Sequence, residues 1–196
     1  MIDLEKECEL TILSAKRQII EFDCGDAELN DFFNNKALHY KNQLLAQTCY
    51  FKHNGTGKVV CAFSLSPNAL KTADLPGSRR KKVKEHIPRE KSMQSYPAFL
   101  VGRLGVASEF SGKGIGSQLI RYIKSYCITK YPDFCRFLLI DAYNNPSVLS
   151  FYRKNNFSLV FSTEEQECDA YKTDASQPLQ TRYLFFDMIH WKDKGC

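Results

Sequence analysis

The stretch that decides the fold reads Leu104-Gly105-Val106-Ala107-Ser108-Glu109-Phe110-Ser111-Gly112-Lys113-Gly114-Ile115-Gly116-Ser117. It overlaps the end of a largely apolar run from Ala98 to Val106, which predicts a buried central strand. It leads into apolar residues at helical spacing between Ile115 and Thr129, which predict an amphipathic helix. A strand, a turn with three alternate glycines and a helix are therefore expected in succession.

The glycine-rich turn is suited to holding a phosphate group. Glycine lets backbone N–H groups approach an anion without a Cβ atom in the way. The helix N-terminus adds aligned donors and about half a positive charge. The spacing is not that of a P-loop, and the third glycine of a dinucleotide fingerprint is missing. We expect a diphosphate to bind the backbone of seven consecutive residues: Ser111, Gly112, Lys113, Gly114, Ile115, Gly116 and Ser117.

The rest of the chain predicts a mixed α/β domain. Upstream, the patterns predict a strand with an approach loop, an amphipathic helix and a hairpin of two strands, over Leu10 to Ile20, Asp26 to Leu44, Thr48 to Lys52 and Lys58 to Leu65. Downstream, they predict a buried strand, a helix opened by Asn145-Pro146 and two closing strands, over Phe137 to Ala142, Asn145 to Lys154, Phe157 to Ser162 and Arg182 to Ile189. Pro67 to Pro97 is expected to be irregular apart from a short helix over Lys81 to Glu85, and Glu164 to Gln180 is expected to be a loop.

Composition is typical of one soluble globular domain of 196 residues, with 43% hydrophobic and 25% charged residues. No apolar run is long enough for a membrane span, and the charged N-terminus lacks the apolar core of a signal peptide. A cytoplasmic protein without a membrane partner is therefore expected. The eight cysteines form no close pairs, so we expect reduced thiols and no metal site.

The formal charge of +5 is concentrated in one segment. Between Lys71 and Lys91, eight basic residues face three acidic ones, so this segment alone nets +5. Such a concentration fits either a solvated loop or a surface for an acidic partner, and both readings stay open. The candidate substrate- or RNA-binding residues here are Arg79, Arg80, Lys81, Lys82 and Lys84.

Two motifs resemble those of the Gcn5-related N-acetyltransferase (GNAT) family. The segment Ser111 to Gly116 is similar to the coenzyme A motif Q/R-x-x-G-x-G/A, with a different first residue. The segment from Asn145 to Phe157 is similar to N-x-x-A-x-x-x-Y-x-x-x-G-F, with Tyr152 in register. Valine replaces the alanine, and Asn156 replaces the glycine. Asparagine tolerates left-handed backbone geometry better than other non-glycine residues, so this change is mild.

The resemblance implies a single GNAT domain over residues 1–196, with a basic insertion at about 71–97. Its sheet would be twisted and mostly antiparallel, with a splayed parallel pair, and flanked by helices. It also implies acetyl-CoA as the cofactor, direct acetyl transfer to an amine and Tyr152 as the proton donor to the departing thiolate. A backbone N–H near Val106 would polarise the thioester carbonyl. The cofactor-binding set then comprises Leu104, Val106, the seven residues of the turn and Asn145. A cysteine acyl-enzyme is not expected, because Cys127 has no histidine close in sequence.

Other segments resemble the toxin-type members of that family. They are Phe22 to Gly25, Leu29 to Phe33, Ala46 to Thr48 and Pro97 to Val106. These members acetylate the amine of aminoacyl-tRNA and pair with a small DNA-binding antitoxin, so tRNA and an antitoxin are the implied partners. Homodimer formation is left open. The chain has only one certain cation, Lys41, late in its first long helix, where these members carry several arginines.

Amine chemistry also favours an α-amine as the acceptor. Removing the proton from a lysine amine at pH 7 costs about 4–5 kcal/mol, against about 1 kcal/mol for an α-amine. The sequence offers no convincing base, and Glu109 is expected to be a solvated acid. Two alternatives stay open: a GNAT enzyme acting on a small-molecule or protein amine, and a non-catalytic module that binds coenzyme A or RNA.

Overall fold

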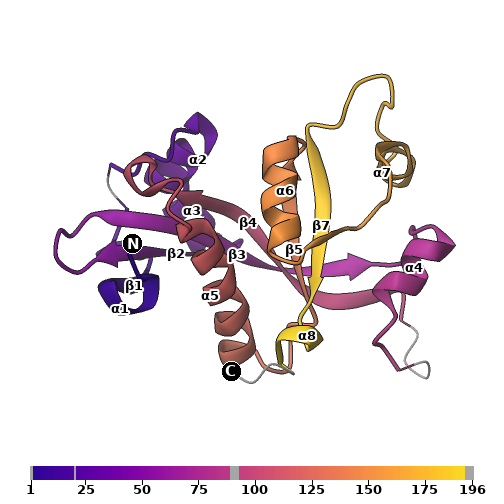
Figure 1. Ribbon diagram of the computed structural model, residues 1–196, viewed down its shortest axis with the longest axis horizontal. Coiled ribbons are helices and arrows are strands. Elements are labelled where there is room, and N and C mark those ends of the chain that lie inside the picture. The colour runs from indigo at the N-terminus through magenta and orange to yellow at the C-terminus, as the bar shows by residue number, and fades with distance from the viewer. Residues whose placement is uncertain (1, 20, 89–92, 193–196) are drawn as a thin grey trace. The chain divides into compact units, whose positions relative to one another are not determined.

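The structure is a computed structural model that describes residues 2–19, 21–88 and 93–192. Its described strands form one seven-stranded mixed sheet in the order β1-β2-β3-β4-β5-β7-β6, with β4 and β5 as the parallel pair. The strands are β1 (Cys8–Ile12), β2 (Gln47–His53), β3 (Val59–Lys71), β4 (Ser95–Val106), β5 (Phe137–Tyr143), β6 (Ser158–Leu159) and β7 (Thr181–Asp187). The α-helices are α1 (Leu4–Glu7), α2 (Ala27–Asp31), α3 (Ala37–Asn42), α4 (Gly77–Val83), α5 (Ile115–Lys130), α6 (Pro146–Lys154), α7 (Glu164–Tyr171) and α8 (Ile189–Lys192) (Figure 1). This is the predicted mixed α/β class, with a parallel pair of strands in a sheet flanked by helices.

The chain divides into two compact units. The first comprises Met1–Ser66 and Val101–Ile123, and the second comprises Pro67–Leu100 and Lys124–Cys196. The long strands β3 and β4 and the helix α5 each contribute to both units.

The first unit confirms the predicted hairpin and most of the predicted helix. Strands β2 and β3 pair antiparallel, and the amide of His53 donates to the carbonyl of Lys58 across the Asn54-Gly55 turn at 2.9 Å. Asp26 caps α2 by accepting from the amide of Leu29 at 2.9 Å. The helix continues through a π-helical turn (Phe32–Lys36) into α3. A buried cluster of this unit contains Phe22, Phe32, Phe33, Ala37, Tyr50 and Ala62.

The strand predicted over Leu10 to Ile20 is shorter in the structure. Strand β1 ends at Ile12, and Ile20 lies outside the described residues. Ser14 and Arg17 then exchange two backbone hydrogen bonds of 3.1 and 3.0 Å, which close a tight turn. The strand therefore occupies only the start of the range predicted for a strand and its approach loop, and a local turn follows it.

In the second unit, β5 pairs antiparallel with β7, and β7 pairs antiparallel with β6. Helix α6 packs along β5 (Figure 1). A buried cluster of this unit contains Leu70, Leu75, Val83, Tyr96, Phe137, Leu139, Val160, Phe161 and Phe185. The buried Leu70 and Tyr96 explain why the segment from Pro67 to Pro97, predicted to be irregular, contains the end of β3 and the start of β4.

Three further predictions in this unit were wrong in extent or type. The short helix predicted over Lys81 to Glu85 lies instead at α4, and the closing strand predicted from Phe157 is reduced to β6. The segment predicted to be a loop from Glu164 contains α7, whose N-cap Thr163 accepts from the amide of Gln166 at 3.3 Å. Glu167 of α7 is buried against Arg182, with 2.6 Å between Oε2 and Nε. Its polar residues therefore make tertiary contacts that a polar sequence does not reveal.

Two predictions about composition can be compared with the described residues. No described helix has both the length and the apolar character to cross a membrane. The seven described cysteines carry free thiols, and most of them are buried.

Candidate functional site

The glycine-rich turn lies in the first unit, between β4 and α5. Gly112 and Gly114 have φ angles of +72° and +77°, in the left-handed region that favours glycine. A Cβ atom added at either position would meet no heavy atom within 4 Å. Backbone geometry therefore accounts for both glycines, and the space above them is open to a bound group.

Helix α5 anchors the C-terminal end of the turn. Ile115, its first residue, is buried, and the amide of Gln118 donates to the carbonyl of Gly114 at 3.2 Å. The side-chain amide of Gln118 also contacts Ile2 and Leu4, donating to the former and accepting from the latter. The first N–H groups of a helix have no partner within it, and the helix dipole favours an anion at this end. The residues present therefore fit a diphosphate.

Two lysines bind Glu109, which lies just before the turn. The Lys113 ammonium donates to the carbonyl of Glu109 at 2.7 Å and lies 5.7 Å from the centre of the Phe110 ring. The Glu109 carboxylate pairs with Lys58 at 2.8 Å, and both side chains are exposed. Glu109 thus has the surface role expected of it. Leu104 and Val106 are half-buried near the end of β4.

One glycine of β4 is required by close packing. A Cβ atom at Gly105 would lie 3.2 Å from the ring of Phe22 and 3.3 Å from Sγ of Cys24. These distances are shorter than most side-chain contacts allow, so glycine lets Phe22 pack against this strand. The strand that precedes the turn is therefore held by the core of the first unit.

Tyr152 lies in the second unit, in the last turn of α6. The helix begins at Pro146, and Asn145 caps it by accepting from the amide of Ser147 at 2.9 Å and from its hydroxyl at 2.7 Å. The helix ends in a Schellman motif, in which the amide of Asn156 donates to Arg153 at 2.9 Å and that of Phe157 donates to Tyr152 at 3.0 Å.

The end of α6 confirms the prediction for Asn156. Its φ angle is +67°, the left-handed geometry for which the related motif uses glycine. The side chain of Asn145 is used as a cap, so the geometry gives it a structural task. Asn145 therefore fixes the start of the helix that carries Tyr152, and Asn156 fixes its end.

The Tyr152 side chain is surrounded by aromatic rings. Its ring lies edge-on to Phe151 and Phe157, with ring centres 5.0 and 5.9 Å apart. Among the described residues, its hydroxyl has no hydrogen-bond partner. Burial raises the pKa of Tyr152 to about 12, because the charged phenolate is poorly solvated. At neutral pH the hydroxyl therefore carries a proton that it can donate.

The predicted site residues are divided between the two units. Leu104, Val106 and the turn from Ser111 to Ser117 belong to the first unit. Asn145, Tyr152 and the basic residues of α4 belong to the second.

The basic segment separates into structural arginines and exposed lysines. The guanidinium of Arg79 donates to the carbonyls of Val160, at 2.9 Å, and Leu159. Arg80 donates to the carbonyls of three residues at 2.7–3.1 Å: Thr72, Ala73 and Leu75. Both guanidinium groups thus hydrogen-bond to backbone carbonyls, and their role in binding substrate stays a prediction. Arg89 and Lys91 lie outside the described residues.

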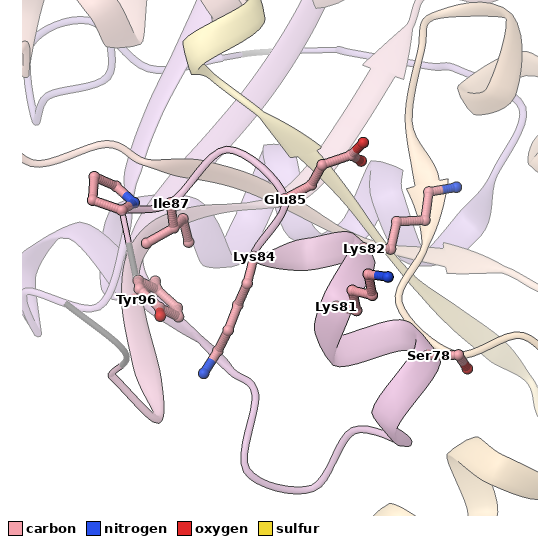
Figure 2. A pocket seen from close by; sticks show the side chains of 8 residues that line it. Ser78, Lys81, Lys82, Lys84, Glu85, Ile87 and Tyr96 are labelled. Atoms are coloured by element: carbon pink, nitrogen blue, oxygen red, sulfur yellow. The ribbon is translucent and has the colours of Figure 1, made fainter. Parts of the chain in front are cut away.

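The three candidate lysines line a cavity of about 530 Å³ on the second unit. Figure 2 shows Lys81 and Lys82 on α4 and Lys84 just after it, with Tyr96 on the cavity wall. The Lys84 ammonium lies 5.9 Å from the centre of the Tyr96 ring. Glu85 also lines this pocket, so three cations and one carboxylate leave a net positive lining that can attract a phosphate group.

Sequence reasoning missed one buried cation, Lys124 of α5, which is only 2% exposed. A signal was present, since Lys124 lies on the helix face that also carries the buried Ile120, Ile123 and Cys127. A lysine on an apolar face is rarely buried without a partner.

A protein-family model matches part of the chain. Residues 85–159 match the acetyltransferase (GNAT) domain, which confirms the predicted resemblance. A tRNA-acetylating toxin of Mycobacterium tuberculosis (strain ATCC 25618 / H37Rv) is 26% identical over 116 residues. The match covers 59% of this chain and 63% of that relative, so it spans less than two thirds of the relative's length.

Solved structures share the fold over nearly the whole chain. AtaT complexed with acetyl-methionyl-tRNAfMet is 18% identical, with a TM-score of 0.69 and coverage of 96% of this chain and all of the other. A mutant of the toxin AtaT, bound to the C-terminus of the antitoxin AtaR and acetyl-CoA, is 15% identical. Its TM-score is 0.67, with coverage of 97% of this chain and 99% of the other. These likenesses confirm the GNAT-type fold.

Proposed function

We propose that this chain, which carries an acetyltransferase (GNAT) domain over residues 85–159, transfers the acetyl group of acetyl-CoA to a primary amine. The preferred acceptor is the α-amine of aminoacyl-tRNA. The observation that carries this proposal is the open glycine turn at the head of the 16-residue helix α5, in a chain that matches an acetyltransferase domain.

The backbone around the turn is proposed to hold the pyrophosphate of coenzyme A. The left-handed geometry of Gly112 and Gly114 and the N-terminus of α5 support this role for Ser111 to Ser117. Leu104 and Val106 would bind the rest of the cofactor from the end of β4, where a backbone N–H near Val106 polarises the acetyl carbonyl. Asn145, which caps the helix of Tyr152, is also proposed to bind the cofactor. Acetyl-CoA supplies a thioester that the amine nitrogen can attack.

Tyr152 is proposed as the general acid of this transfer. As the carbon–sulfur bond breaks, its hydroxyl donates a proton to the departing thiolate, and the attacking amine loses a proton to solvent. The phenol is protonated at neutral pH, as a general acid must be, and its place in the last turn of α6 matches the tyrosine of the related motif.

Two observations support aminoacyl-tRNA as the acceptor. A relative that matches part of the chain is a tRNA-acetylating toxin, and the similar AtaT has been solved with acetyl-methionyl-tRNAfMet. The cavity lined by Lys81, Lys82 and Lys84 offers cations for RNA phosphates. An α-amine also needs no strong base, which fits the pairing of Glu109 with Lys58.

The remaining parts of the proposal concern the cellular location, the protein partner and the oligomeric state. We propose a single catalytic domain acting in the cytoplasm, where charged tRNA is found. A small DNA-binding antitoxin is the proposed protein partner, because the similar toxin AtaT is bound to the antitoxin AtaR. A homodimer is proposed as the form of the free enzyme.

A panel of acceptors tests this function. The protein is incubated with radiolabelled acetyl-CoA and charged tRNA, deacylated tRNA, spermidine or a lysine peptide. We expect label on charged tRNA alone, at the amino acid. Label on spermidine or the peptide alone would reassign the acceptor to a small-molecule or protein amine. Acetyl-CoA binding with no labelled product from any acceptor would make the chain a binding module.

A further inference from the structure

The ammonium group of Lys124 is buried within the second unit. The residue is 2% exposed, although lysine is almost never fully buried in folded proteins. Burying a charge is costly unless other groups replace the lost water. The groups around this ammonium therefore indicate what the residue does.

Three aromatic rings surround the ammonium. Nζ of Lys124 lies 3.5 Å from the ring centre of Phe186, 5.1 Å from that of Phe157 and 5.3 Å from that of Trp191. These rings, which we call the lysine cage, come from β7, from the second residue after the C-cap of α6 and from α8. Each distance is within the range of a cation–π interaction. A single side chain of α5 thus holds three separate segments together.

The same ammonium also binds the end of α6. Nζ of Lys124 donates to the carbonyl of Asn155 at 2.7 Å. Asn155 is the C-cap of α6, where the last carbonyls lack helical partners and the helix dipole is negative. A cation at this point stabilises the end of the helix both as a donor and by its charge.

This end of α6 is the turn that carries Tyr152. The amide of Asn155 donates to the carbonyl of Tyr152 at 3.1 Å, and that of Phe157 donates to the same carbonyl at 3.0 Å. The Phe157 ring, a member of the lysine cage, is also packed edge-on against the Tyr152 ring. The Asn155 carbonyl and the Phe157 ring, which both contact the ammonium, therefore belong to the segment that sets the position of the phenol.

We propose that Lys124 is a positioning residue for Tyr152. By binding the Asn155 carbonyl and the cage, it fixes the last turn of α6 and with it the direction of the phenol hydroxyl. A purely apolar side chain could fill the space but could not bind the carbonyl. The inference rests on the proposed role of Tyr152 as the general acid.

A double-mutant cycle tests this inference. Lys124→Met keeps the apolar stem and removes the donor and the charge, and Lys130→Met on the exposed end of α5 is the matched control. We expect Lys124→Met to lower kcat about tenfold to a hundredfold, the scale of a misplaced catalytic group. Acetyl-CoA affinity, measured by calorimetry, should stay within about threefold, since only the acid is misplaced. Lys130→Met should behave as wild type.

The decisive comparison is made in the Tyr152→Phe background. If Lys124 acts through the phenol, adding Lys124→Met to Tyr152→Phe lowers kcat no further. An equal loss in both backgrounds, or no loss in either, would overturn the inference while leaving the proposed function intact. A Tyr152→Phe variant with wild-type kcat would instead contradict the proposed function of Tyr152. If Lys124→Met does not fold, Phe186→Leu, which removes the nearest ring, is put through the same cycle with the same expected results.

Discussion

At the scale of single residues, the groups around the Tyr152 phenol determine its pKa. Aromatic rings exclude water from it, and its hydroxyl has no partner among the described residues. Desolvation disfavours the phenolate, which is why burial raises the pKa of Tyr152 to about 12. A general acid with such a pKa is in its active, protonated form throughout the neutral range.

This protonation state predicts the alkaline side of the pH profile. An acid acts only while protonated, so a raised pKa moves its loss of activity to higher pH. We therefore expect that kcat does not fall with a midpoint near pH 10, the ordinary pKa of tyrosine. Thiol release is measured from pH 7 to 11, with tRNA carrying its amino acid through a stable amide bond. A fall in kcat centred at pH 10 or below would contradict the buried phenol as the acid.

Sequence reasoning succeeded at residues whose role is local. The Asn145-Pro146 helix start and the left-handed Asn156 follow from backbone preferences that a short motif records. It missed Lys124, because its cage is assembled from residues more than thirty positions away. It also could not tell that Arg79 and Arg80 are bound to backbone carbonyls, since basic residues in a polar segment look alike in sequence.

At the scale of elements, the glycine turn and the N-terminus of α5 together form the proposed binding site for the pyrophosphate. Gly114 has a φ angle of +77° and open space around it, so alanine there is strained by backbone geometry alone. We expect Gly114→Ala to cost about 1–2 kcal/mol of stability, as for any left-handed residue. It should also weaken acetyl-CoA binding, because the amides of the turn shift.

The matched control for this prediction is Gly57→Ala. Gly57 has a similar φ angle of +70° in the hairpin turn between β2 and β3. Thermal unfolding and calorimetric titration with acetyl-CoA are measured for both variants. The control should lose comparable stability with unchanged affinity. If the two variants bind acetyl-CoA with equal affinity, the turn is not part of the binding site.

Helix α4 makes a second prediction at this scale. Its arginines bind the backbone, whereas Lys81 and Lys82 are exposed on the cavity wall. We expect Lys81→Ala/Lys82→Ala to keep the melting temperature and weaken tRNA binding. The slope of log affinity against log salt should fall by about 0.7–0.9 for each lost phosphate contact. Arg80→Ala should do the reverse, losing stability while keeping the salt slope. A double lysine variant with an unchanged slope would exclude this surface from RNA binding.

The elements that sequence reasoning predicted are those with their own periodicity. Helices α5 and α6 and strand β5 lie within one or two residues of their predicted ranges. It did not predict α7, because the buried pair of Glu167 and Arg182 that anchors this helix is a tertiary contact. The same holds for the ends of β3 and β4, which extend because Leu70 and Tyr96 join a distant core.

At the scale of the whole molecule, the thiols distinguish direct transfer from a cysteine intermediate. Burial raises the pKa of Cys49 to about 11 and raises that of Cys61 well above the ordinary thiol value. Since the thiolate is the reactive form, we expect iodoacetamide at pH 7.5 to label both only after unfolding. Mass spectrometry of native and unfolded protein measures this. Rapid native labelling of either residue would contradict the burial of these thiols, and an acetyl group found on a cysteine after incubation with acetyl-CoA would contradict direct transfer.

The central claim is that Tyr152 supplies the proton for acetyl transfer to charged tRNA. The most direct test is the single-turnover rate of labelled acetyl transfer from saturating acetyl-CoA, compared between wild type and Tyr152→Phe. We predict a loss of about a hundredfold to ten-thousandfold in the transfer rate, the usual contribution of a general acid. Acetyl-CoA affinity and melting temperature should be preserved. A Tyr152→Phe variant that transfers acetyl at the wild-type rate would contradict the account.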